Sequence, residues 1–200
     1  MSSQIIPNAP GAARFWQQEA QRISGAAWFA VMALSTVGIA IIVNQIFNLQ
    51  ILGWRPISTA YYYIVLGLFM PVAFLGTPAR QADASRVRWY DWVLAVAAFG
   101  ICIFFSTRTD AILYQGWEFE APTYVVVMAT CLVLLSLEAV RRCAGLPLLI
   151  ICAIFATFPL YTGHMPGFLW GAQMSFSETV LSHSLGVESI IGIPLRVIAD

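Results

Sequence analysis

The chain alternates between long uncharged apolar runs and short polar turns. Each run, taken with its flanks, approaches the length at which a helix can cross a bilayer, which is roughly 17–25 residues for a hydrocarbon core of about 30 Å. Strand-like alternation is absent from these runs. The pattern therefore predicts an all-α, polytopic transmembrane bundle of about five spans, over 26–47, 61–75, 89–105, 123–140 and 146–161.

Composition supports a membrane location. Of the 200 residues, 60% are hydrophobic and only 10% are charged, whereas soluble domains carry about 25% charged residues. The net charge is zero and lysine is absent. We therefore expect the bilayer as a partner and expect no nucleic acid.

The arginines cluster in alternate turns, and this predicts the orientation. With the N-terminus in the cytoplasm, seven arginines fall on the inner face and two on the outer face, which follows the rule that positive charge stays inside. The inner set is Arg14, Arg22, Arg80, Arg86, Arg88, Arg141 and Arg142, and the outer set is Arg55 and Arg108.

A charged hinge joins the fourth and fifth predicted spans. Glu138 lies three and four residues before Arg141 and Arg142, so the three side chains can pair on one helix face. One interpretation is a local ion pair that fixes the helix end at the headgroups. The alternative is a contact to a partner subunit or a domain junction.

Two predicted span starts carry polar or aromatic residues. Tyr61, Tyr62 and Tyr63 are expected to form an aromatic belt at the outer interface. Asp91 suits a helix N-terminus, where a carboxylate accepts free backbone N–H groups. The competing hypothesis for Asp91 is a role in proton or ion coupling.

Catalytic and metal-binding motifs are not recognisable in the sequence. It has no nucleophile elbow, phosphate loop or metal-ligand spacing, and the four cysteines suit apolar packing. His164 and His183 fall outside the predicted spans, which argues against a haem or redox subunit. We therefore expect no enzyme activity, no catalytic residue, no metal ligand and no bound cofactor.

The segment 163–200 is less apolar and is broken by glycine and proline. Ser175 and Glu178 form a capping-box pattern, which predicts a short interfacial helix over 176–185 on the outer face. Gly192 and Pro194 interrupt a further apolar piece. Such a break marks either a discontinuous helix of the kind found in transporters or an ordinary span entry.

Four stretches, taken in order, resemble the fused permeases of TRAP (tripartite ATP-independent periplasmic) transporters. They are YYYIVLGLFMPVAFLGTPAR at 61–80, YDWVLA at 90–95, LEAVRRCAGLPLLI at 137–150 and GVESIIGIPLRVIA at 186–199. The third resembles the junction that these fused proteins place after their fourth helix.

This resemblance implies a division of the chain. Residues 1–24 would be a cytoplasmic or interfacial segment, 25–142 a four-helix domain like the small subunit, and 143–200 the incomplete beginning of the large transport subunit. The resemblance also implies a bacterial inner-membrane permease that takes up an organic acid delivered by a periplasmic solute-binding protein. Na⁺ would drive uptake, and its site and the substrate site would lie outside these 200 residues.

On this hypothesis the chain is mainly a scaffold, and its partner is the remaining transport domain, in the same chain or in another subunit. The alternatives are a small structural or assembly membrane protein and a truncated, non-functional permease fragment. The reading frame beyond Asp200 and a neighbouring gene for a binding protein would distinguish them.

Overall fold

The described part of the chain is helical. A computed structural model describes residues 22–50, 53, 56–80, 83 and 85–186, and no strand occurs among them. The long helices are α2 (Ala26–Ile46), α3 (Ser58–Gly76), α4 (Trp89–Thr107) and α6 (Thr123–Ala144). Each of these four helices is long and apolar enough to cross a membrane, as the sequence pattern predicts for the first four spans.

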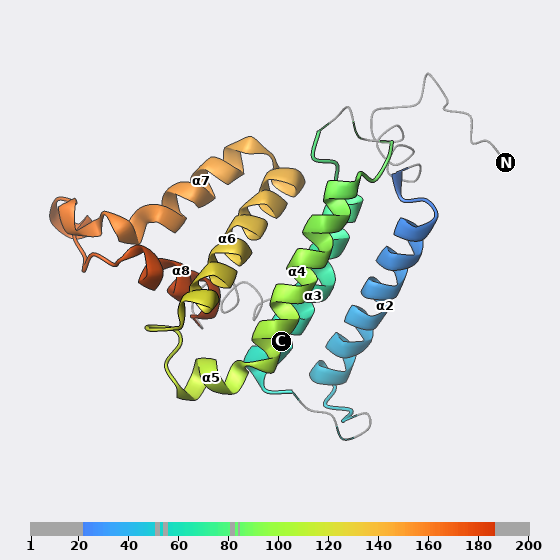
Figure 1. The fold of residues 1–200 in the computed structure, drawn as a ribbon, viewed down its shortest axis with the longest axis horizontal. Helices are drawn as coiled ribbons and strands as arrows, with labels where there is room; N and C mark the ends of the chain where they lie inside the picture. Colours follow the sequence, from blue (N-terminus) through green and yellow to red (C-terminus); the bar gives the residue numbers. More distant parts are fainter. Residues whose placement is uncertain (1–21, 51–52, 54–55, 81–82, 84, 187–200) are drawn as a thin grey trace.

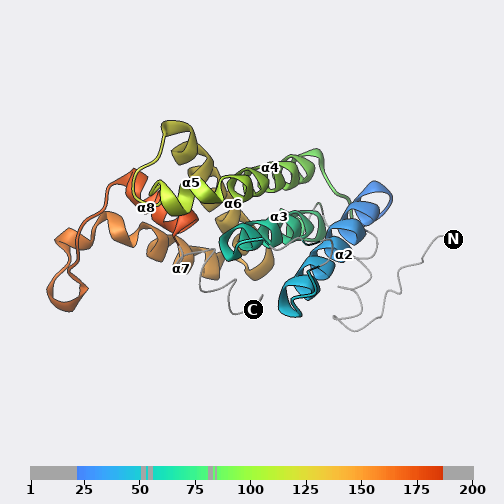
Figure 2. The same cartoon turned by 90° about the horizontal axis from the view of Figure 1, so that it is seen from below.

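The four long helices run alternately up and down, and α3 and α4 lie side by side (Figures 1 and 2). Small side chains allow these two backbones to approach closely. A methyl group added at Gly67 would lie 2.8 Å from Cβ of Cys102, which is itself fully buried. Close approach through small residues is typical of helix pairs in membranes, where dispersion and packing replace the hydrophobic effect.

Helix α2 flanks α3 and leaves most of its apolar surface uncovered. Its exposed large side chains are Trp28, Phe29, Met32, Val37, Ile39, Val43 and Ile46. Water would make this surface costly to expose, whereas a lipid bilayer solvates it. The exposure of α2 is therefore what a lipid-facing helix requires.

The three tyrosines at the start of α3 do not form the predicted belt. Tyr61, Tyr62 and Tyr63 are buried inside the bundle, and the Tyr63 hydroxyl donates a hydrogen bond to the Ser184 carbonyl (2.9 Å). The prediction was wrong because these rings pack inside the bundle: Tyr63 contacts Ser184 of α8, and its ring lies 5.4 Å from the ring of Phe105 in α4. The predicted outer loop after α4 also contains a short helix, α5 (Thr109–Tyr114).

The fifth predicted span is shorter than its apolar run. Helix α7 (Leu146–Thr157) has 12 residues, which gives a length of about 18 Å at 1.5 Å per residue. It continues as a 3₁₀ turn, η3 (Phe158–Leu160), and two more such turns follow, η4 (Thr162–His164) and η5 (Gly167–Leu169).

Helix α8 (Phe176–Leu185) begins and ends where the sequence predicts. The Ser175 hydroxyl accepts the Glu178 N–H, and the Glu178 carboxylate accepts the Ser175 N–H (2.7 Å), so both halves of the capping box form. Helix α8 packs against α6 through a hydrogen bond from the Ser184 hydroxyl to the Ala129 carbonyl (3.0 Å). Helices α7 and α8 thus lie on the side of α6 away from α2 (Figure 1).

Candidate functional site

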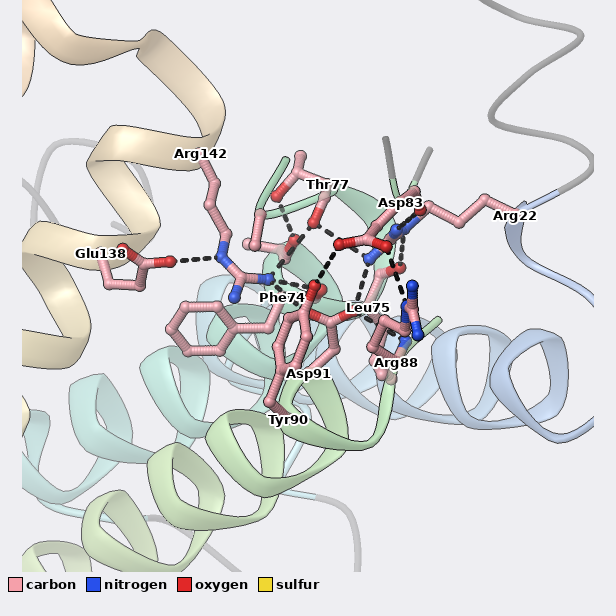
Figure 3. A network of polar contacts seen from close by, with 12 residues as sticks. Arg22, Phe74, Leu75, Thr77, Asp83, Arg88, Tyr90, Asp91, Glu138 and Arg142 are labelled. Carbon is pink, nitrogen blue, oxygen red and sulfur yellow. Dashed lines mark hydrogen bonds and ion pairs between the residues drawn. The ribbon is translucent and has the colours of Figure 1, made fainter. Parts of the chain in front are cut away.

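Charged side chains from α4, α6 and the segment before α2 meet at one end of the bundle, beside the last backbone carbonyls of α3. We call Arg22, Asp91, Glu138, Arg141 and Arg142 the inner-end cluster, because the arginine distribution predicts that this end faces the cytoplasm. Asp91 lies at its centre and is fully buried. Arg22 and Arg142 reach its two carboxylate oxygens from opposite sides (Figure 3), at 2.9 and 2.7 Å.

Arg22 joins the segment before α2 to the turn between α3 and α4. Its Nε donates to the Leu75 carbonyl (3.0 Å), and its Nη2 donates to the Thr77 carbonyl (3.2 Å) as well as to Asp91. Its Nη1 donates to the carbonyls of Asp83 (2.8 Å) and Arg86 (3.0 Å). The last carbonyls of a helix lack partners within the helix, so Arg22 satisfies the end of α3.

Arg142 makes the corresponding connection from α6. Its Nη1 donates to Asp91 and lies within 3.3 Å of the Phe74 carbonyl and 3.4 Å of the Thr77 carbonyl. The guanidinium carbon lies 5.2 Å from the centre of the Phe74 ring, within the range of a cation–π contact. Its Nε donates to Glu138 (2.7 Å).

Glu138 also binds Arg141. The two nitrogens Nε and Nη2 of Arg141 donate to the two carboxylate oxygens, each at 2.7 Å. This bidentate geometry is the stronger form of an arginine–carboxylate pair. Three guanidinium groups and two carboxylates therefore share one end of the bundle, and the cluster carries one excess positive charge.

The geometry of Asp91 makes it a structural anchor. One oxygen accepts from Arg142, and the other accepts from Arg22 and from the Arg88 backbone N–H (3.0 Å). No part of the side chain is exposed to solvent. A carboxylate with both oxygens bound to fixed donors has no free position for a cation, which disfavours the ion-coupling hypothesis for this residue.

A second polar group borders the cluster in the turn before α4. Asp83 accepts hydrogen bonds from the Tyr90 hydroxyl (2.7 Å) and from Nε of Arg88 (2.8 Å). These two bonds, the first above all, lower the pKa of Asp83 below its ordinary value. Asp83 therefore remains ionised and fixes the turn that places Asp91.

Sequence reasoning found part of this site. The predicted pairing of Glu138 with both arginines is present, and Asp91 accepts a backbone N–H at the start of α4 as expected. The convergence of Arg22 and Arg142 on Asp91 was missed. Gly192 and Pro194, the candidate broken-helix residues, lie outside the described residues.

Among the described residues, no group of three or more histidine, cysteine or carboxylate side chains lies close enough together to hold a metal ion. Cys102 is buried, and Cys131 and Cys143 are exposed as free thiols. The chain was compared with known proteins, and no protein-family model, curated protein or solved structure matches it.

Proposed function

We propose that this chain is the scaffold part of a TRAP-type permease in the bacterial inner membrane. In this role it holds a transport domain in the bilayer while that domain moves an organic acid or similar solute into the cell. A periplasmic binding protein would deliver the solute, and an ion gradient, usually of Na⁺, would drive uptake. The sequence resemblance supports the choice of family, and the inner-end cluster supports the scaffold role.

The closed ion network around Asp91 is the observation that carries the proposal. It joins the segment before α2 to the end of α3, the start of α4 and the end of α6 through buried hydrogen bonds. A transport site needs groups that open to solvent on at least one side. The cluster instead suits a rigid frame against which another domain can move.

Helix α7 supports a junction with a further domain. The chain leaves α6 through Gly145, whose φ of +85° favours glycine. None of the α7 residues is buried, although most are apolar. A helix that is apolar on all sides is normally covered by lipid or protein, and we propose that the remaining transport domain, in the same chain or a partner subunit, covers part of α7.

A stand-alone structural or assembly protein, or a truncated permease fragment, is the competing proposal. Its helices would require no transport domain, and lipid alone would cover α7. The two proposals therefore differ in what the chain binds in its own membrane.

Purification from the native membrane tests this difference. The N-terminus would be tagged at its own locus, and the protein would be extracted in a mild detergent and analysed by denaturing and native gels with mass spectrometry. We expect a multi-helix transport domain, either as a denatured band far above 22.0 kDa or as a separate co-purifying subunit. A tagged species near 22 kDa that carries no such domain in either gel would refute the proposal.

A further inference from the structure

A hollow of about 610 Å³ opens beside the inner-end cluster, between the end of α3, the start of α4 and the end of α6. Four arginines and two carboxylates line it, which leaves an excess of two positive charges. They are Arg80, Arg88, Arg141, Arg142, Asp83 and Glu138. A cationic hollow at a helix-bundle end attracts anions.

Two of the arginines are more exposed than the carboxylates they bind. The Arg88 side chain is 58% exposed, whereas the side chain of its partner Asp83 is only 11% exposed. Arg141 is likewise more exposed than Glu138. At these two pairs an approaching ligand therefore meets the guanidinium group first, and the carboxylate holds that group in place from behind. Arg142 lies deeper, since its side chain is about 1% exposed.

Hydrogen-bond donors remain available in the hollow. Arg88 uses Nε on Asp83, and its two Nη groups have no hydrogen-bond partner among the described residues. Arg80 is exposed and forms no ion pair within the described part of the chain. The paired N–H groups of a guanidinium match the oxygen spacing of a phosphate group. Arg80 and Arg88 can therefore each donate hydrogen bonds to a phosphate.

The hollow continues onto apolar surface at the depth of the membrane interface. Leu94 forms part of its wall, and Leu134, one helical turn from Glu138 on the same face of α6, is 60% exposed. Trp89, next to Arg88, is 75% exposed, and exposed tryptophan is enriched at headgroup depth. A ligand with a phosphate head and an apolar tail fits this succession of surfaces.

We propose that this hollow binds an anionic phospholipid of the inner leaflet. The phosphate would lie on Arg80 and Arg88, and an acyl chain would follow the apolar surface at Leu94 and Leu134. Basic pockets between helices on the cytoplasmic side bind anionic headgroups in this way. The proposal does not depend on the transport function.

A hollow of about 660 Å³ at the other end of the bundle provides an internal contrast. Glu120 and Glu178 line it, and no arginine does, so it would repel a phosphate group. Anion binding should therefore depend on the arginines of the inner hollow and be insensitive to Arg108, which lies at the opposite end of α4.

Thermal unfolding of the full chain in a neutral detergent tests the proposal. Short-chain phosphatidylglycerol, phosphatidylcholine and inorganic phosphate would be added separately to wild type, R80Q, R80Q/R88Q and R108Q. We expect phosphatidylglycerol alone to raise the melting temperature by several degrees. The shift should fall in R80Q, disappear in R80Q/R88Q and persist in R108Q, which makes the same charge change elsewhere.

Native mass spectrometry keeps the test decisive if R80Q/R88Q does not fold. R80Q leaves the Arg88–Asp83 pair intact, and we expect it to retain fewer phosphatidylglycerol molecules than R108Q. Equal lipid retention in these two variants would overturn the proposal. An equal rise in melting temperature with phosphatidylcholine would also overturn it, because it would show general solvation by lipid. An equal rise with inorganic phosphate would overturn it too, because it would show a site for free anions.

Discussion

Asp91 holds two guanidinium groups that are almost completely buried. The side chains of Arg22 and Arg142 are each about 1% exposed. Removing water from a charge costs several kcal/mol, and only the opposite charge and the surrounding carbonyls offset this cost. Removing the Asp91 carboxylate would therefore leave two buried guanidinium groups without it, whereas removing one arginine would leave Asp91 paired with the other.

We expect Asp91→Asn to be strongly destabilising. The amide preserves the shape but leaves Arg22 without any carboxylate among the described residues, whereas Arg142 retains Glu138. Removing one partner of a buried ion pair typically costs about 3–5 kcal/mol. Unfolding in mixed micelles with increasing SDS measures the change in the free energy of unfolding.

Asp110→Asn is the matched control, because Asp110 is exposed on α5. Its unfolding midpoint should remain close to that of wild type. If Asp91→Asn and Asp110→Asn shift the midpoint by the same small amount, the cluster does not stabilise the bundle and the structural role of Asp91 is wrong.

The packing of α3 on α4 depends on the absence of a side chain at Gly67. A methyl group there would meet Cβ of Cys102 at 2.8 Å, and neither backbone can move without disturbing the rest of the pair. We expect Gly67→Ala to destabilise the bundle by about 1–3 kcal/mol, the usual cost of overpacking. The same SDS titration measures it.

Gly100, also in α4, provides a control of opposite sign. A methyl group added there meets no atom within 4 Å, and alanine favours a helix over glycine by roughly 0.5–1 kcal/mol. Gly100→Ala should therefore be neutral or stabilising. Equal effects of the two substitutions would show that Gly67 does not set the distance between α3 and α4.

Helix α8 should loosen at its start in acid. Hydrogen bonds from the Ser175 backbone N–H and hydroxyl lower the pKa of Glu178 from 4.5. The capping interaction is therefore fully present above this ordinary value and is lost as the pH falls through the lowered pKa of the folded state. Hydrogen exchange of the α8 amides across this pH range should show the loss of protection.

Glu178→Gln should remove that pH dependence, because its amide does not ionise. Ser175→Ala keeps the backbone N–H that binds the carboxylate, and it should weaken α8 by about 1 kcal/mol, the typical value of an N-cap hydroxyl. Ser182→Ala, within the same helix, should retain the pH dependence, and identical exchange profiles in Glu178→Gln and Ser182→Ala would show that the capping box does not control the start of α8.

At the scale of the whole molecule, the sequence was sufficient for features that depend on local patterns. The four long helices follow from uncharged runs, and α8 follows from the spacing of Ser175 and Glu178. The predicted fifth span, 146–161, is an apolar helix over Leu146–Leu160, but its α-helical part ends at Thr157 and its last three residues form the 3₁₀ turn η3, a change that hydropathy cannot show.

The contacts between distant segments could not be predicted in the same way. Arg22 and Asp91 are 69 positions apart, and no periodicity connects them. Tyr63 was misinterpreted for the same reason, since its burial depends on a helix more than 100 residues later. One weak signal was present: Asp91 is a single carboxylate at a span start on the arginine-rich face.

The orientation of the bundle should depend on Arg141 and Arg142, which lie in the last turn of α6 at the end predicted to face the cytoplasm. Replacing both with glutamate would reverse the local charge and remove the contact of Arg142 with Asp91. Cysteine-accessibility mapping in intact cells should then show mixed orientation or failed assembly. Arg108→Glu at the other end serves as control, and normal orientation and assembly in the double variant would argue against this role.

Solute uptake into membrane vesicles tests the scaffold account most directly. Right-side-out vesicles from the native bacterium and from a strain lacking the gene would receive radiolabelled organic acids, periplasmic extract and an imposed Na⁺ gradient. If the chain is the scaffold of such a permease, uptake of at least one acid will require the gene, the extract and the gradient, and will not require ATP. Equal uptake in both strains for every acid would contradict it.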